Sequence, residues 1–298
     1  MTRNMMTNTE PERLLQEVER VARQAGEFLR HERETFTLER VEQKHAHDYV
    51  SDVDRGSERL VVDELRRLLP EAGFVTEEGL ATFDGEERYW VIDPLDGTTN
   101  YIHGMRSYAV SIALCRGREI ELGVVFDASV DEMFSAYRGG GAWLTSPSAG
   151  GEAPASRRRQ PLHVSSLPFS QALMGVELPY DAQAYAPFGL ALLRHLYGRV
   201  GGIRMNGSAA IALCHVAAGR LDGWLERHLG RYDYMAGAII VEEAGGCVTN
   251  FLGSPDYTMG DDIVATNGLF HDDLLRLIKE YRQRSEEIGR LRSERSKK

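Results

Sequence analysis

Cysteine is scarce in this sequence: Cys115, Cys214 and Cys247 lie far apart and form no CxxC pair. A dispersed set of this kind argues against a disulfide framework and for reduced thiols in a cytosolic protein. Long apolar runs are also missing, because no stretch approaches the roughly 18 residues of a membrane-spanning helix. The N-terminal segment lacks the apolar core of a secretory signal. We therefore expect a cytoplasmic protein with no membrane partner.

A surplus of basic charge is missing as well. The 298 residues carry 45 acidic and 35 basic side chains, for a net charge of −10. Because a protein must neutralise phosphates to bind nucleic acid, this balance argues against a general nucleic-acid binder. The remaining composition, 42% hydrophobic and 27% charged, is ordinary for a globular protein and allows a sizeable core.

Helical and strand-like patterns alternate along the first half of the chain. Apolar residues recur at helical spacing near the N-terminus, and shorter runs of β-branched and aromatic residues follow later. The predicted elements are a helix over residues 10–33, a loop over 44–55, a second helix that ends at Pro70, a short strand with a polar end over 74–79, a strand over 89–93, and an antiparallel meander over 107–137.

A segment rich in Ser, Gly, Ala and Pro, residues 145–161, predicts a flexible loop insertion between the two halves. Its arginine run at 157–159 is typical of a solvated charge cluster. The second half alternates strands near 171–177, 200–205 and 222–226 with helices near 184–197, 208–219 and 234–246, followed by two short strands and a last helix from Phe270. We predict a layered α/β fold with mixed sheets, as one domain over 8–285 with lobes over 8–160 and 161–285 and a charged tail over 286–298.

Two carboxylates follow the predicted strand 89–93 in the stretch WVIDPLDGTTN. Asp93 and Asp96 flank Pro94, which cannot donate to a sheet ladder, so we expect the chain to leave the sheet there. Such a turn would aim both carboxylates and the Leu95 carbonyl at one point, an oxygen cage that suits Mg²⁺. Taken alone, the pattern is equally typical of a turn whose aspartates cap the next segment.

Further acidic residues stand at the ends of other predicted elements. They are Glu77 and Glu78 after FVT, Asp48, Asp52 and Asp54 before the second helix, and Asp233 at the start of the helix near 234. Carboxylates brought together without a cation repel one another, and their pKa values rise. A bound divalent cation removes that penalty, so the distribution favours a metal site.

The second component of a reaction site is the GTT that follows Asp96. The backbone amides of Gly97 and Thr98 open the next segment and can hold an anion such as phosphate. Carboxylates for a metal beside amides for an anion indicate metal-assisted phosphate chemistry.

The segment WVIDPLDGTTNYIHG resembles the first signature of the inositol monophosphatase family, and residues 207–246 are similar to that family's C-terminal region. FVTEEG and KHAHDYVSDVD stand where the family has its paired glutamates and its lysine- and aspartate-containing loop. The resemblance covers nearly the whole chain and implies a layered αβαβα sandwich of the sugar-phosphatase type with mixed sheets. The sequence departs from the family pattern at Thr76, Gly79 and Tyr232, which stand where glycine, serine and tryptophan are usual.

The resemblance also implies roles for individual residues. One Mg²⁺ would be held by Glu77, Asp93 and the Leu95 carbonyl, a second by Asp93, Asp96 and Asp233, and a third, weaker one by Glu77 and waters. The phosphate would be held by the amides of Gly97 and Thr98, the attacking water by Asp54 and Thr98, and the substrate hydroxyls by Asp96, Ala209, Glu226 and Asp233. Activation of the water by the Asp54–Thr98 pair or by Glu77 with the third ion stays open.

The activity implied is Mg²⁺-dependent hydrolysis of a phosphate monoester of a small polyol or sugar, with myo-inositol 1-phosphate favoured. A homodimer and sensitivity to Li⁺ are implied as well. The alternatives within the enzyme class are fructose-1,6-bisphosphatase and histidinol-phosphatase activity. A regulatory binding partner of the transcription machinery is the alternative of another class. The net charge of −10 and the full set of metal carboxylates argue against a purely binding role.

Overall fold

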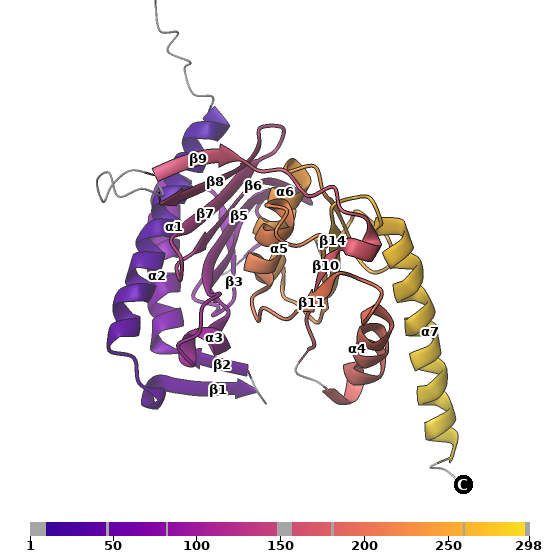
Figure 1. The fold of residues 1–298 in the computed structure, drawn as a ribbon. Coiled ribbons are helices and arrows are strands. Elements are labelled where there is room, and N and C mark those ends of the chain that lie inside the picture. Colours follow the sequence, from indigo (N-terminus) through magenta and orange to yellow (C-terminus); the bar gives the residue numbers. More distant parts are fainter. Residues whose placement is uncertain are drawn as a thin grey trace, which may run out of the picture.

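Two mixed β-sheets alternate with pairs of helices in the computed structural model, which describes residues 10–45, 48–81, 83–147, 157–179, 182–258 and 260–295 (Figure 1). In the described part of the chain, the first sheet has seven strands in the order β3-β4-β5-β6-β7-β8-β9. Its strands are β3 (Gly73–Thr76), β4 (Arg88–Asp96), β5 (Ala109–Arg116), β6 (Glu119–Asp127), β7 (Glu132–Tyr137), β8 (Gly141–Pro147) and β9 (Arg157–Pro161). β3 and β4 are parallel and each later pair is antiparallel, which confirms the predicted strand at 89–93 and the meander.

The second sheet is built from the C-terminal half, in the order β11-β10-β12-β14-β13. Its strands are β10 (Leu173–Val176), β11 (Gly202–Arg204), β12 (Gly223–Arg227), β13 (Cys247–Thr249) and β14 (Asp262–Thr266). The pairs β10–β11 and β10–β12 are parallel, and the pairs that include β14 are antiparallel. The strands predicted for this half are therefore confirmed.

Helices cover the outer faces of both sheets and fill the space between them (Figure 1). The helices are α1 (Glu10–Glu34) and α2 (Asp52–Leu68) on the first sheet, α5 (Ala209–Ala217) and α6 (Arg231–Glu243) between the sheets, and α4 (Ala182–Leu196) and α7 (His271–Arg295) on the second sheet. The short elements are the hairpin β1 (Val41–His45) and β2 (Asp48–Ser51), helix α3 (Thr98–Ile102), and 3-10 turns at Leu38–Arg40 and Phe169–Gln171. Among the described helices, none is both long and apolar enough to cross a membrane.

Three apolar cores hold these layers together, and β4 shows how the sequence divides between two of them. Trp90 and Ile92 pack with α1 and α2, whereas Tyr89 and Val91 pack with α5 and α6 on the opposite face. This is the two-residue alternation of a strand that is buried on both sides. A third core joins the second sheet to α4 and α7. The succession of layers confirms the αβαβα sandwich with mixed sheets.

The loop predicted over residues 44–55 is wrong. β1 and β2 pair as an antiparallel hairpin, and α2 begins at Asp52, with residues 46 and 47 outside the described part. The helix begins there because Ser51 caps it: its hydroxyl accepts from the Val53 amide at 3.2 Å, and the Asp54 carboxylate accepts from the Ser51 amide at 2.8 Å. A reciprocal cap of this kind satisfies amides that a helix start otherwise leaves unpaired.

The loop predicted over 145–161 is also wrong at both of its ends, which belong to β8 and β9; residues 148–156 lie outside the described part. The arginine run at 157–159 is not simply solvated. Arg157 donates to Asp131 at 2.7 Å, and the Arg159 guanidinium lies 4.7 Å from the centre of the Trp143 ring. Farther along, the backbone of α7 continues through most of the charged C-terminal segment to Arg295.

Candidate metal centre

The end of β4 brings the first two aspartates of the site to the side of the sheet that faces α6. Strand alternation turns Asp93 to the same face as Val91, opposite Ser111 of β5. The ladder is interrupted after Asp93 and resumes where Asp96 lies opposite Ala109. The expectation that the chain leaves the sheet at Pro94 is therefore wrong: proline breaks the ladder, but the chain stays beside β5.

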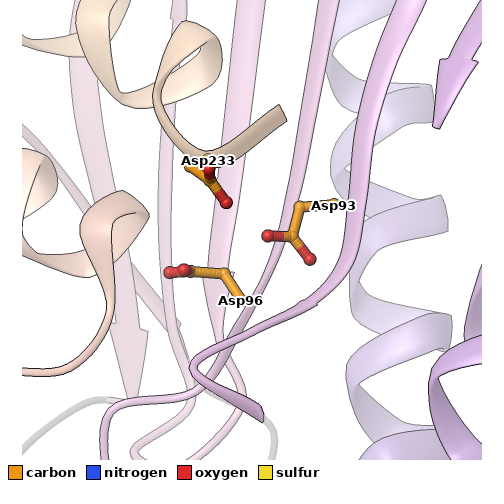
Figure 2. Close-up of side chains that lie close together, drawn as sticks. All are labelled: Asp93, Asp96 and Asp233. Atoms are coloured by element: carbon orange, nitrogen blue, oxygen red, sulfur yellow. The ribbon is translucent and has the colours of Figure 1, made fainter. Parts of the chain in front are cut away.

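Asp233, near the start of α6, completes a compact group. Its carboxylate accepts from the Gly230 amide at 2.6 Å, which places it in the first turn of the helix, where the dipole favours a negative charge. Figure 2 shows the side chains of Asp93, Asp96 and Asp233 gathered close together, with Asp233 at the start of the helix above the two others. One oxygen from each of the three lies within 4.8 Å of the other two.

These carboxylates repel one another in a buried place. Asp93 is 2% exposed and Asp96 is 6% exposed. Burial, then the charges of Glu77, Asp96 and Asp233, raises the pKa of Asp93 well above its usual range. Burial raises the pKa of Asp96 to about 6, although hydrogen bonds from Ser208 and the Ala210 amide act in the opposite direction. A divalent cation would offset this repulsion, and the donors are the hard oxygens that Mg²⁺ prefers.

Glu77 contributes to the charge of the site from the end of β3. Its backbone amide donates to the Ile92 carbonyl at 3.2 Å, so it stands next to the strand that carries Asp93. Burial and then the charge of Glu77 raise the pKa of Asp233 well above its usual range. The group within 4.8 Å comprises the three aspartates and does not include Glu77.

Thr98 and Asp54, predicted to act together, are brought together. The Thr98 hydroxyl lies 3.3 Å from Asp54 Oδ1 and 2.9 Å from the Leu95 carbonyl oxygen, and either oxygen can accept the hydrogen bond that its single proton donates. The other Asp54 oxygen accepts from the Ser51 amide at 2.8 Å and from the Ser51 hydroxyl at 2.6 Å. The capping box of α2 thereby fixes the carboxylate that faces Thr98.

Gly97 precedes the first turn of α3, where the amides predicted to hold phosphate lie. Its φ of 84° is in the left-handed region, and a Cβ at this position would lie 2.5 Å from the Ser107 carbonyl oxygen. A side chain is excluded on both grounds, so glycine is required for this turn.

The family model of the inositol monophosphatase family matches residues 10–284 of the sequence. The chain belongs to the inositol monophosphatase family. A protein named inositol-1-monophosphatase from Rhizobium meliloti (strain 1021) is 41% identical over 222 residues, which cover 74% of this chain and 79% of that protein. A protein named Nus factor SuhB from Escherichia coli (strain K12) is 35% identical over 249 residues, 83% of this chain and 89% of that one.

Solved structures agree with this assignment. An IMPase of Thermotoga maritima superposes with a TM-score of 0.79 at 29% identity, over 92% of this chain and 99% of that one. An inositol monophosphatase of Anabaena (Nostoc) sp. PCC 7120 gives a TM-score of 0.76 at 33% identity, over 91% and 97%. As a member of this metal-dependent family, the chain is a phosphatase of the hydrolase class.

Ser208, which caps α5, is a site residue that sequence reasoning did not predict. Its hydroxyl donates to Asp96, and the Ala210 amide donates to the same carboxylate oxygen at 3.1 Å. The start of α5, where Ala209 was predicted to face the substrate, is thus attached to Asp96. A serine before an apolar helix signals the cap, but only the tertiary structure shows the carboxylate that it meets.

A carboxylate that the sequence did not reveal, Glu177, lies beside the predicted Glu226. Both line a hollow with Arg227 and with apolar residues of β10 and α4. Glu177 accepts from the amides of Asn206 and Gly207 at 2.5 and 3.2 Å. Burial, followed by the charges of Glu177, Asp233 and Asp96, raises the pKa of Glu226 well above its usual range.

Proposed function

We propose that this chain hydrolyses the phosphate monoester of a small polyol or sugar with the help of Mg²⁺, and that myo-inositol 1-phosphate is its substrate. The observation that carries the proposal is the convergence of the buried Asp93 and Asp96 with the half-buried Asp233, within 4.8 Å of one another and beside the amides at the start of α3. A carboxylate cluster next to backbone donors fits a metal and a phosphate bound together.

We assign the metal ligands from this arrangement and from the family. Glu77, Asp93 and the Leu95 carbonyl would hold one Mg²⁺, and Asp93, Asp96 and Asp233 a second. A third, weaker ion would use Glu77. Bound there, Mg²⁺ would supply charge neutralisation for the phosphate and activation of a water.

The protein's own groups would hold the phosphate and orient the water. The amides of Gly97 and Thr98 would bind phosphate oxygens. The Thr98 hydroxyl donates toward Asp54 or Leu95, so its lone pairs remain to accept a hydrogen bond from the attacking water. Asp54, 1% exposed and fixed by Ser51, would keep Thr98 in that orientation.

The two glutamates that line the hollow between β10, β12 and α4 support a polyol as the leaving alcohol. The carboxylates of Glu177 and Glu226 accept hydrogen bonds, which hydroxyl groups donate. Ala209 and Asp96 would face the same alcohol from the start of α5.

The test is phosphate release from a panel of substrates in Mg²⁺ and in EDTA. The panel comprises myo-inositol 1-phosphate, fructose 1,6-bisphosphate, histidinol phosphate and 3′-phosphoadenosine 5′-phosphate. We expect Mg²⁺-dependent release that is fastest with inositol 1-phosphate. Release from no member of the panel, or release that EDTA leaves unchanged, would overturn the proposal.

A second candidate function rests on the relatives named Nus factor SuhB. We propose that this chain also binds a component of the transcription machinery, independently of hydrolysis. An inactive Asp93→Asn variant should then be retained by the transcription elongation complex as the wild type is. Failure of both proteins to bind that complex would refute this role.

The family resemblance alone leads us to expect inhibition by Li⁺ and a homodimer in solution, and the composition of the sequence leads us to expect a cytoplasmic location. A Li⁺ titration of phosphate release and sedimentation of the purified protein would test the first two. Cell fractionation would test the third.

A further inference from the structure

Glu58 of α2 is a glutamate with no exposed surface, and its relative exposure is 0%. No ion pair to Lys, Arg or His is present for it within the described part of the chain. Its two carboxylate oxygens instead accept from backbone amides, one from Glu78 at 2.8 Å and one from Leu80 at 2.7 Å. Burial of a carboxylate costs free energy unless hydrogen bonds compensate for the lost water, so these two hydrogen bonds are what stabilise the buried Glu58 carboxylate.

The segment that Glu58 holds, residues 77–80, directly continues β3 and begins with the proposed metal ligand Glu77. One end of the segment is attached to β4, because the Glu77 amide donates to the Ile92 carbonyl at 3.2 Å. Gly79 has a φ of 70°, and a Cβ there would meet nothing within 4 Å. Its left-handed backbone conformation, rather than a lack of space, is what lets the amides on either side reach one carboxylate.

Glu58 shares its helix face with two other residues that hold the site. Asp54, Ser57 and Glu58 are spaced i, i+3 and i+4, which places them side by side on α2. Asp54 accepts from Thr98, and the Ser57 hydroxyl donates to the Pro94 carbonyl at 2.8 Å. One face of α2 therefore contacts the irregular end of β4 at Pro94, the start of α3 and the segment after β3.

We propose that Glu58 is a positioning residue that holds Glu77 at the metal centre through the backbone of residues 78–80. The inference rests on the proposed function, because it takes Glu77 to be a Mg²⁺ ligand. Glu58 itself touches neither metal nor substrate. Its removal should therefore weaken Mg²⁺ binding and leave the reaction intact once Mg²⁺ is saturating.

Two substitutions separate the hydrogen bonds of Glu58 from its charge. Glu58→Gln keeps one acceptor oxygen and turns an NH₂ group toward a backbone N–H, whereas Glu58→Asp keeps the charge but is one methylene too short. Glu64→Gln is the matched control, because Glu64 is on the same helix and binds Arg20 on the surface at 3.1 Å. The measurements are calorimetric titration of the metal-free proteins with Mg²⁺, thermal unfolding, and kcat at saturating Mg²⁺.

We expect both Glu58 variants to raise the Mg²⁺ dissociation constant by about 10- to 100-fold, as is typical of groups that orient metal ligands. Their kcat at saturating Mg²⁺ should stay within about threefold of wild type, and Glu64→Gln should change neither quantity. Wild-type Mg²⁺ affinity in both Glu58 variants would overturn the inference while the proposed function stands. Weakened binding in Glu58→Gln alone would also overturn it, since charge rather than reach would then be responsible.

Two further observations keep the tests distinct. A wild-type protein that neither binds Mg²⁺ nor releases phosphate would refute the proposed function itself. If the variants do not fold, amide hydrogen exchange of the metal-free wild type decides: slow exchange at Glu78 and Leu80 supports the holding role, and exchange at the rate of an open loop overturns it.

Discussion

Asp93→Asn should make the metal-free protein more stable while it abolishes turnover. Asp93 is buried, and one of its oxygens lies within 4.8 Å of oxygens of Asp96 and Asp233. Its pKa is raised by burial and by those neighbouring charges. Asparagine has nearly the same shape, can still accept the hydrogen bond that the Leu95 amide donates at 2.9 Å, and carries no charge.

The magnitude follows from Coulomb's law. Two unit charges 4.8 Å apart repel by about 3.5 kcal/mol at an effective dielectric constant of about 20. Asp93 has two such neighbours, but proton uptake by the cluster relieves part of the repulsion. We therefore expect the free energy of unfolding to rise by roughly 2 to 4 kcal/mol at pH 8 without metal. For a chain of this size, that corresponds to a Tm increase of about 4 to 8 °C.

The dependence on pH has a definite sign. A carboxyl whose pKa is higher in the folded than in the unfolded state destabilises the fold once the pH exceeds its unfolded value. The difference between variant and wild type should therefore be small near pH 4 and grow as the pH rises. Mg²⁺ should reverse the order, because it stabilises the wild type and not the variant.

Thermal unfolding with and without Mg²⁺, paired with a phosphate-release assay, checks this prediction. The control is Asp63→Asn, the same chemical change at a side chain of α2 that is 54% exposed; it should shift neither Tm nor rate. A metal-free Asp93→Asn protein no more stable than wild type would refute the electrostatic reasoning. Near wild-type turnover in that variant would refute the assignment of Asp93 to the metal centre.

Three further predictions concern separate parts of the molecule. Thr98→Val removes the hydroxyl that bonds to Asp54 and Leu95, so kcat should fall by about 100-fold with Mg²⁺ affinity unchanged in a calorimetric titration; an unaltered kcat would exclude Thr98 from orienting the water. Glu226→Gln should raise KM for inositol 1-phosphate by about tenfold but not for p-nitrophenyl phosphate, which lacks the polyol; an equal change with both substrates would contradict a contact to substrate hydroxyls. Burial lowers the pKa of His215 from 6.5 to about 4, so protonation of the unfolded state should reduce stability as the pH falls between these values. The loss should approach 3 kcal/mol, and His215→Gln should remove it from urea-unfolding midpoints at pH 7 and pH 4.5; the same acid loss in both proteins would show that other groups are responsible.

Local sequence patterns were sufficient to predict an element where the residues of that segment alone determine its secondary structure. The apolar run before Asp93 predicted β4, and the helical spacing of apolar residues near the N-terminus predicted α1. The aspartates were expected to meet because each stands at the end of an element, and Asp93, Asp96 and Asp233 do meet. Pro94 was misjudged because a bulge lets a strand continue past a residue that cannot donate.

Other features depend on contacts between distant segments, so no local pattern predicts them. β9 is polar, and its composition alone is typical of a loop. Its arginines form ion pairs with Asp131 and Glu19, which lie far away in the sequence. In the sequence, Glu58 resembles any surface glutamate on a helix; in the structure, it is buried and bonded to the backbone of the segment 77–80. Tertiary hydrogen bonds of this kind override local propensity, which is why these residues emerged only from the structure.

The central claim is that the carboxylates of Glu77, Asp93, Asp96 and Asp233 form a metal centre next to a phosphate site. Anomalous diffraction from crystals soaked with Mn²⁺ and inorganic phosphate tests it most directly. We predict one peak bounded by Glu77 and Asp93, a second bounded by Asp93, Asp96 and Asp233, and phosphate density at the amides of Gly97 and Thr98. The absence of peaks at these carboxylates, with Mn²⁺ bound elsewhere or not at all, would contradict the account.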